Sequence, residues 1–197
     1  PEQFMFNQSQ LQAFYFFESV TINGDSLGWD DWVGAFRMGG SCTNPLGTSE
    51  ELCDLLGEDW HPEEICVGAK QWDTSVCGGG ICEVAVMGDN GDDFTAGYMM
   101  AGEIPIFRIF DASDSAYYDA VSSEDYPWST TGLYYLESLE NIITGCTDSD
   151  ACNYEDGANV DDGSCLENDC AGECGGSAVV DECGVCGGDG IDEGACD

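Results

Sequence analysis

The residues best suited to chemistry are the oxygen-bearing side chains concentrated between Gly145 and Cys165. This stretch reads GCTDSDACNYEDGANVDDGSC and contains no lysine or arginine. A hard divalent cation such as Ca²⁺ takes about six to eight oxygen ligands from carboxylates, amide oxygens and backbone carbonyls. We therefore predict a Ca²⁺ loop, with Asp148, Asn153, Asp161 and Asp162 as side-chain ligands and Asp150 and Asp156 as weaker candidates. The alternative is that these aspartates are solvated surface.

The same loop carries cysteines that can hold it in place. It is too small and too polar to bury a core of its own, so cross-links at Cys146, Cys152 and Cys165 are expected to take that role. An EF-hand fits less well, because a loop started at Asp148 has Cys152 at its fifth position and no glycine after it.

The stretch resembles a short calcium module of secreted bacterial proteins that reads G-C-T-D-x-x-A-x-N-Y-x-x-x-A-x-x-D-D-G-S-C, and every fixed position is present here. The module is similar to the thrombospondin type 3 repeat, which implies calcium ligation by the matching acidic positions. Some copies of the module lack a cysteine at the position of Cys152. This resemblance implies that Cys146 pairs with Cys165 and that Cys152 reaches into the next segment.

The composition changes after Asn141, and residues 146–197 hold eight of the thirteen cysteines and no basic residue. We place a boundary near Thr144, between a domain at 1–144 and a cysteine-rich, calcium-binding tail at 145–197. The strings DCAGECGG and DECGVCGG in the tail resemble a cysteine–glycine repeat that often follows the calcium module. DECGVCGGD also resembles part of the cysteine-rich region of some secreted metalloproteases. Structural disulfides of open connectivity are expected at Cys152, Cys170, Cys174, Cys183, Cys186 and Cys196.

The first domain is predicted to be all-β, because short apolar runs alternate with turns rich in Gly, Asn and Asp. A β-sandwich of the immunoglobulin-like or carbohydrate-binding-module type is the expected architecture. The predicted strands are Gln3–Phe6, Leu11–Ile22, Trp32–Met38, Ile65–Trp72, Ile81–Met87, Ile104–Phe110, Ala116–Val121 and Leu133–Leu139.

Two of these strands carry a motif. The string WVGAF at 32–36, followed by CVGA at 66–69, resembles a hairpin of secreted bacterial β-sandwich modules, and FRIFDAS at 107–113 resembles the same modules. Residues of about 39–64 are interpreted as an insertion at the hairpin tip. It is predicted to contain a helix with a capping box at Thr48 and Glu51, an apolar face of Leu52, Leu55 and Leu56, and an end at Gly57. A disulfide between Cys42 and Cys53 would staple it.

Smaller features of the first domain add candidate sites. Cys77 and Cys82 flank a glycine run and are predicted to pair, which leaves Cys66 odd; a buried free thiol is favoured over an intermolecular disulfide. Acidic loops suggest a second calcium site at Asp25, Asp30, Asp89 and Asp92, although ordinary hairpin turns favour the same residue types. Asn7 begins an N-glycosylation pattern.

The charge balance limits the partners. Forty acidic residues against three basic ones give a formal charge of −37, which argues against nucleic acid and anionic membrane as partners. Thirteen cysteines indicate an oxidising compartment and a secreted or cell-surface protein. No apolar run is long enough for membrane insertion. A chain that starts at Pro1 is interpreted as a processed mature protein.

The sequence does not favour an enzyme. His61 is the only histidine, and a glycosidase with paired carboxylates is the remote alternative. Two readings remain open. A carbohydrate-binding or adhesion module would stack glycans on Trp60, Trp72, Tyr126 and Trp128. We favour the other, a subunit of a calcium-stabilised filament or surface appendage that joins copies of itself head to tail. In this hypothesis the apolar segment Pro1–Phe17 completes the sheet of the next subunit, and the alternative is that it is an ordinary first strand.

Overall fold

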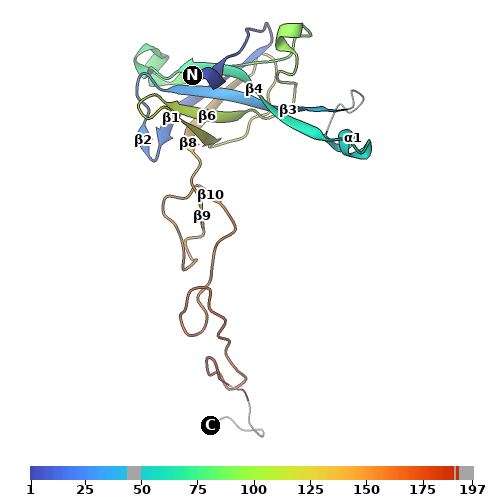
Figure 1. The fold of residues 1–197 in the computed structure, drawn as a ribbon. Helices are drawn as coiled ribbons and strands as arrows, with labels where there is room; N and C mark the ends of the chain where they lie inside the picture. Colours follow the sequence, from blue (N-terminus) through green and yellow to red (C-terminus); the bar gives the residue numbers. More distant parts are fainter. Residues whose placement is uncertain (44–49, 189, 191–197) are drawn as a thin grey trace. The chain divides into compact units, whose positions relative to one another are not determined.

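The structure, a computed structural model, describes residues 1–43, 50–188 and 190; the side chains of residues 41, 42, 50 and 60–62 lie outside the description. The chain divides into two compact units, Pro1–Asn141 and Ile142–Asp197, called unit 1 and unit 2 below. Figure 1 shows the elements of each unit. The sequence placed this division near Thr144. No described helix has the length and apolar character needed to cross a membrane.

Unit 1 is mostly β, as predicted. Its elements are the 3-10 helices η1 (Glu2–Phe4), η2 (Thr74–Val76), η3 (Gly78–Gly80) and η4 (Asp93–Thr95), the helix α1 (Glu50–Leu55), and the strands β1 (Gln12–Ile22), β2 (Asp25–Ser26), β3 (Trp32–Cys42), β4 (Trp60–Gln71), β5 (Cys82–Met87), β6 (Ile106–Asp111), β7 (Ala116–Ser122) and β8 (Leu133–Asn141). Each predicted strand from Leu11 onward corresponds to one of these. The predicted strand Gln3–Phe6 is wrong, because η1 covers Glu2–Phe4 and Met5 and Phe6 belong to no strand.

The hydrogen bonding differs from the expected pair of stacked sheets. The strands form one mixed sheet in the order β2-β1-β8-β7-β6-β3-β4, with β5 also paired to β1. The connection is made by β1, which pairs with β5 on one edge and with β8 on the other. Residues 12–17 pair antiparallel with β5, and residues between Phe14 and Thr21 pair parallel with β8. β1 therefore links β5 to the rest of the strand path within one hydrogen-bonded sheet.

The main hydrophobic core lies on one face of this sheet. Alternate side chains of β1, β3, β5 and β6 point into it, as the period of two in a strand requires; they include Ala13, Tyr15, Phe17, Val33, Ala35, Val84, Val86, Phe107 and Ile109. β4, at one end of the strand path, also approaches β5, since a Cβ on Gly68 of β4 would lie 2.1 Å from the carbonyl oxygen of Ala85 in β5. Only glycine fits at this close approach.

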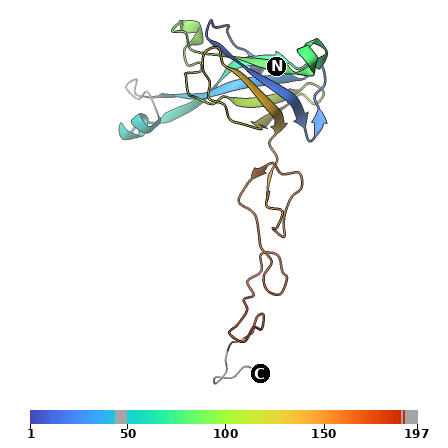
Figure 2. The same ribbon diagram turned by 180° about the vertical axis from the view of Figure 1, so that it is seen from behind.

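The strands β3 and β4 continue beyond the sheet as a two-stranded arm. Pairing of β3 with β6 ends at Phe36, but pairing with β4 runs on to Cys42 and Trp60. The arm leads to α1 (Figures 1 and 2). The predicted insertion is therefore largely a continuation of the hairpin, and the helix in it is confirmed. Gly57 has the left-handed φ of +70° expected at a helix end.

The predicted apolar face of α1 is not buried. Leu55 is 81% exposed, and Leu52 and Leu56 are also exposed, whereas Cys53 between them is buried. Cys53 is disulfide-bonded. The side chain of Cys42 and the capping residue Thr48 lie outside the described residues, so the proposed staple and capping box stay predictions.

Unit 2 consists of turns and two short parallel strands, β9 (Thr144–Gly145) and β10 (Val160–Asp161). Among its described residues only Gly145 and Cys146 are buried. Apolar burial is therefore too small to hold this unit together, and covalent and polar contacts take its place.

Candidate calcium loop and disulfide ladder

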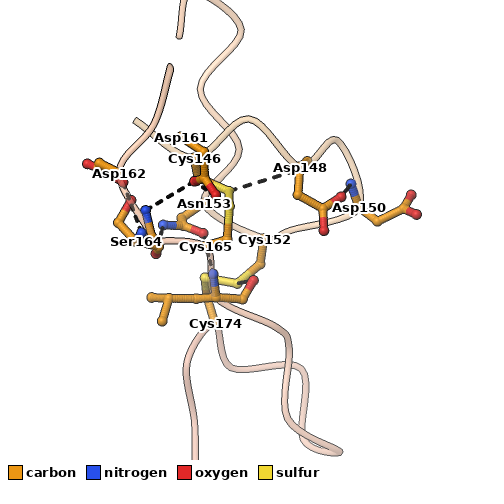
Figure 3. The surroundings of a disulfide bond; sticks show 12 residues. Cys146, Asp148, Asp150, Cys152, Asn153, Asp161, Asp162, Ser164, Cys165 and Cys174 are labelled. Carbon is orange, nitrogen blue, oxygen red and sulfur yellow. Dashed lines mark hydrogen bonds between the residues drawn. A yellow bond between two sulfur atoms is a disulfide. The ribbon is translucent and has the colours of Figure 1, made fainter. Parts of the chain in front are cut away.

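The disulfide between Cys146 and Cys165 closes the predicted calcium loop, with the two Cα atoms 4.8 Å apart (Figure 3). This is the pairing that the module resemblance implies. β9 and β10 stand beside it, because Gly145 pairs with Asp161. A Cβ on Gly145 would lie 2.5 Å from the carboxylate of Glu155, so the glycine lets this side chain approach the backbone.

Asn153 fastens the loop from within. Its Oδ1 accepts a hydrogen bond from the backbone N–H of Leu166 at 2.7 Å, and its Nδ2 donates to the carbonyl oxygen of Ser164 at 2.7 Å. Both ends of the amide are therefore engaged by the segment that follows Asp162. The structure gives Asn153 the role of a clamp across the loop, where the sequence predicted a cation ligand.

Three of the predicted aspartates cap turns with one carboxylate oxygen. The Oδ1 atoms of Asp148, Asp161 and Asp162 accept hydrogen bonds from the N–H groups of Asp150, Gly163 and Ser164, at 2.9, 3.2 and 2.9 Å. Hydrogen bonds from Ser164 hold the pKa of Asp162 below its usual value, because they favour the charged carboxylate.

These side chains do not converge on one point. Figure 3 shows Asp148 and Asp150 on one side of the Cys146–Cys165 disulfide and Asp162 on the other, with Asp150 and Asp162 directed away from each other. Asp156 is exposed. In the described part of the chain, no three His, Cys, Asp or Glu side chains form a group that could hold a metal ion. The donor types suit Ca²⁺, but this geometry does not supply a single coordination sphere.

The second predicted calcium site is divided between two places. Asp25 and Asp30 line a pocket with Asp31, whereas Asp89 and Asp92 lie in the loop before η4 and are not in its lining. Asp31 is buried and accepts hydrogen bonds from the N–H groups of Gly28 at 2.6 Å and Ala112 at 2.9 Å. Its carboxylate joins two loops of unit 1.

Further along unit 2, disulfides overlap in sequence. Cys152 pairs with Cys174, so it does reach into the next segment, and Cys170 pairs with Cys186. Together with Cys146–Cys165 these three bonds form what we call the disulfide ladder. Cys183 is also disulfide-bonded, and Cys196 lies outside the described residues.

Two aspartates that the sequence reasoning missed shape the turns of the ladder. Oδ1 of Asp169 accepts hydrogen bonds from the N–H groups of Ala171 and Glu173, both at 2.9 Å, and Oδ2 accepts one from Ala178 at 3.0 Å. These bonds hold the pKa of Asp169 below its usual value. Asp181 repeats the arrangement with Cys183, Val185 and Gly190.

A repeated string could have revealed these two turns. Both aspartates begin the pattern D-x-x-x-x-C-G-G, at Asp169 and at Asp181. The second glycine of each string is required by space, because a Cβ on Gly176 or Gly188 would lie 2.1 Å from an Oδ2 of the preceding aspartate.

The other cysteines of unit 1 are accounted for as follows. Cys77 pairs with Cys82, as predicted, with Cα atoms 5.2 Å apart. Cys66 is free and buried, and burial raises its pKa to about 11. Since the thiolate is the reactive form, this thiol is chemically quiet at neutral pH.

The predicted glycan platform does not form. Trp72 and Trp128 are each only 3% exposed and belong to the core, and Tyr126 is half-buried and stacked on Tyr134. The side chain of Trp60 lies outside the description. The glycosylation candidate Asn7 is exposed, and its Nδ2 donates to the carbonyl oxygen of Phe94 at 3.0 Å.

No protein-family model matches this chain, and no curated protein or solved structure matches it. The fold and the site therefore define only a class: a mostly β unit followed by a disulfide-tied unit. Four disulfides with both partners described indicate folding in an oxidising, extracellular environment.

Proposed function

We propose that this chain is an extracellular structural subunit whose copies join head to tail in a calcium-stabilised filament or appendage. The observation that carries the proposal is the disulfide ladder. Overlapping disulfides stabilise unit 2, which buries almost no apolar side chains. Such covalent stabilisation is typical of a structural element of an extracellular protein.

An exposed apolar strip on unit 1 supports contact with other chains. On the outer face of β1 and β8, Phe16 stacks on Tyr135 with ring centroids 4.7 Å apart, and Phe14 pairs with Leu133 in the neighbouring register position. Leu133 and Tyr135 are 59% and 62% exposed. A contiguous exposed apolar patch is typical of an interaction surface.

The ion pairs support a requirement for cations. All three basic side chains are used within unit 1: Arg37 with Glu103, Lys70 with Glu83, and Arg108 with Glu64 and Asp119. None remains to form an ion pair across a contact between copies that each carry −37. Close association therefore needs counter-ions, and Ca²⁺ bound at the exposed carboxylates of 145–165 would provide them.

The fold assignment that accompanies this proposal is a sandwich-type secreted module. The WVGAF and CVGA strings form the paired strands β3 and β4. We infer two facing layers, since β4 approaches β5 closely at Gly68 and Ala85 although β4 and β5 are not hydrogen-bonded partners.

The proposal is tested with the purified full chain by light scattering and negative-stain microscopy, in excess Ca²⁺ and in excess chelator. We expect elongated assemblies that grow with protein concentration in Ca²⁺ and that shorten on chelation. Tyr135→Glu is expected to weaken association, whereas Val179→Glu, at an apolar site of unit 2 that is 73% exposed, leaves it unchanged. A chain that stays monomeric at high concentration with Ca²⁺ present would refute the proposal.

A further inference from the structure

We infer that residues 1–10 are exchanged between copies, so that Phe4 of one chain fills the slot over Gly34 of the next. This inference rests on the proposed function and assigns the contact that gives the assembly its direction. The predicted donor, Pro1–Phe17, is corrected by the structure. Gln12–Phe17 is part of β1 and pairs with β5, while most of it also pairs with β8, so it cannot leave without opening the sheet.

The slot is a built site on the outer face of the sheet. Phe4 is 4% exposed and lies over Gly34 of β3, where a Cβ would come within 2.8 Å of its ring. The rings of Phe36 and Tyr117 stand edge-on to it, each with a centroid distance of 5.6 Å. These residues and Cys66 form an apolar cluster separate from the main core, and we call this place the Phe4 slot.

The segment that fills the slot is held in a way that permits exchange. It contains η1 and no strand, so no backbone ladder has to break. Its hydrogen bonds to the rest of unit 1 run through side chains. The N–H of Asn7 donates to Tyr98 Oη at 2.6 Å, and Ser9 Oγ donates to the carbonyl oxygen of Gly88 at 2.7 Å. The contacts of Phe4 and Asn7 can form again in a second copy, which is the condition for a low-cost swap.

The exchanged segment carries little charge. Residues 1–10 include a single acid, Glu2. The slot lies beside one of the three cations, because the guanidinium of Arg108 stands 5.2 Å from the centroid of the Phe36 ring. Arg108 is already paired with Glu64 and Asp119, so the electrostatic advantage lies in the segment, which brings only one carboxylate into the contact.

Each chain has one such segment and one slot, and they are different surfaces. A contact of this heterologous kind leaves a free segment at one end and a free slot at the other, and it therefore propagates unless the rotation closes a ring. The Phe4 slot thus accounts for the head-to-tail direction of growth.

The test uses a photoreactive benzoylphenylalanine at position 5. Met5 is 78% exposed, so the substitution leaves Phe4 in place. Unlabelled and ¹⁵N-labelled chains are unfolded and refolded together in equal amounts, assembled in Ca²⁺ and irradiated. Peptides that join residues 1–10 to β3 or β7 are then classified by mass spectrometry. Exchange predicts that light–heavy pairs are as frequent as light–light and heavy–heavy pairs together.

The same probe at Val76, which is 75% exposed and outside the segment, is the control and should give no peptide joined to the slot. Monomers isolated from the same mixture should give only same-label pairs. Assemblies in which every slot cross-link is same-label would overturn the exchange and leave the proposed function standing. A failure to assemble at all would overturn both.

Discussion

The ring of Phe4 occupies the space that a side chain on Gly34 would need, since a Cβ at position 34 would lie 2.8 Å from the nearest ring carbon. The glycine of the WVGAF string therefore has a specific partner. Trp32 and Phe36 pack around the same apolar cluster, while Val33 and Ala35 point into the core.

Gly34→Ala is expected to displace Phe4 and lower the free energy of unfolding by about 1–3 kcal/mol, the usual cost of overpacking. Chemical denaturation of the monomer measures it. In a Phe4→Ala background the same substitution should cost much less, because the clash is gone. Gly78→Ala, which meets nothing within 4 Å, is the control. Equal effects of Gly34→Ala in both backgrounds would contradict the contact.

Removing the Cys146–Cys165 bond with paired serines should destabilise unit 2 by about 3 kcal/mol, the loop-entropy value for a separation of this size. Its sequence separation is 19, against 5 for Cys77–Cys82, so the same change at Cys77 and Cys82 should cost about 2 kcal/mol or less and act on unit 1. Hydrogen exchange resolved by unit distinguishes the two. Loss of protection in unit 1 after the Cys146 and Cys165 changes would argue against two separate units.

Calcium is expected to raise the unfolding midpoint of unit 2, because a ligand that binds only the folded state stabilises it. The gain is about 2.7 kcal/mol at a free concentration about one hundred times the dissociation constant. Calorimetry in Ca²⁺ and in chelator measures the shift. The double substitution Asp161→Asn and Asp162→Asn should remove most of it, whereas Asp54→Asn in α1 should not. Identical midpoints with and without Ca²⁺ would exclude the loop as a calcium site.

Acid should loosen the turn at Asp169. Hydrogen bonds from backbone N–H groups depress the folded pKa of this carboxyl. Its contribution to stability is therefore complete above the unfolded value of about 3.9 and is lost as the pH falls through the lower folded value. Amide exchange of Ala171 and Glu173 should quicken in that range. Asp169→Asn should flatten the dependence of this exchange on pH. Glu173→Gln leaves the Asp169 carboxylate and the backbone N–H of residue 173 in place, so it should preserve that dependence.

Cys66 should resist thiol reagents while unit 1 is folded. Burial raises its pKa to about 11, so little thiolate exists at pH of about 8, and the sulfur is shielded as well. Titration with Ellman's reagent should detect no fast-reacting thiol in the native protein and one after unfolding in denaturant. Rapid labelling of the native chain would show that this region opens readily.

Strand positions were predictable because alternation and turn residues are local signals. The segment Gln3–Phe6 misled for the same reason: its aromatics suit a strand, but Phe4 is buried by Gly34 and Tyr117, which are distant in sequence. The single sheet could not be predicted either, because no local sequence signal shows that β1 pairs with both β5 and β8.

In the predicted calcium loop, the sequence shows which side chains carry oxygen ligands but not where those side chains point. Asp148 and Asp162 have the oxygens that Ca²⁺ prefers, yet each uses one oxygen to cap its own turn. Asn153 has the same chemistry as a ligand, and its amide is engaged by Leu166 and Ser164. Hydrogen bonds of this kind depend on the folded backbone, which spacing alone does not determine.

The disulfide ladder has a mechanical consequence. When unit 2 is pulled along the chain, tension entering at Cys146 crosses directly to Cys165, follows the backbone to Cys170 and crosses again to Cys186. The turns built on Asp162 and Asp181 lie outside this load path and cannot lengthen under force. The segment therefore behaves as a nearly inextensible tether, and its slack is released only by a reductant.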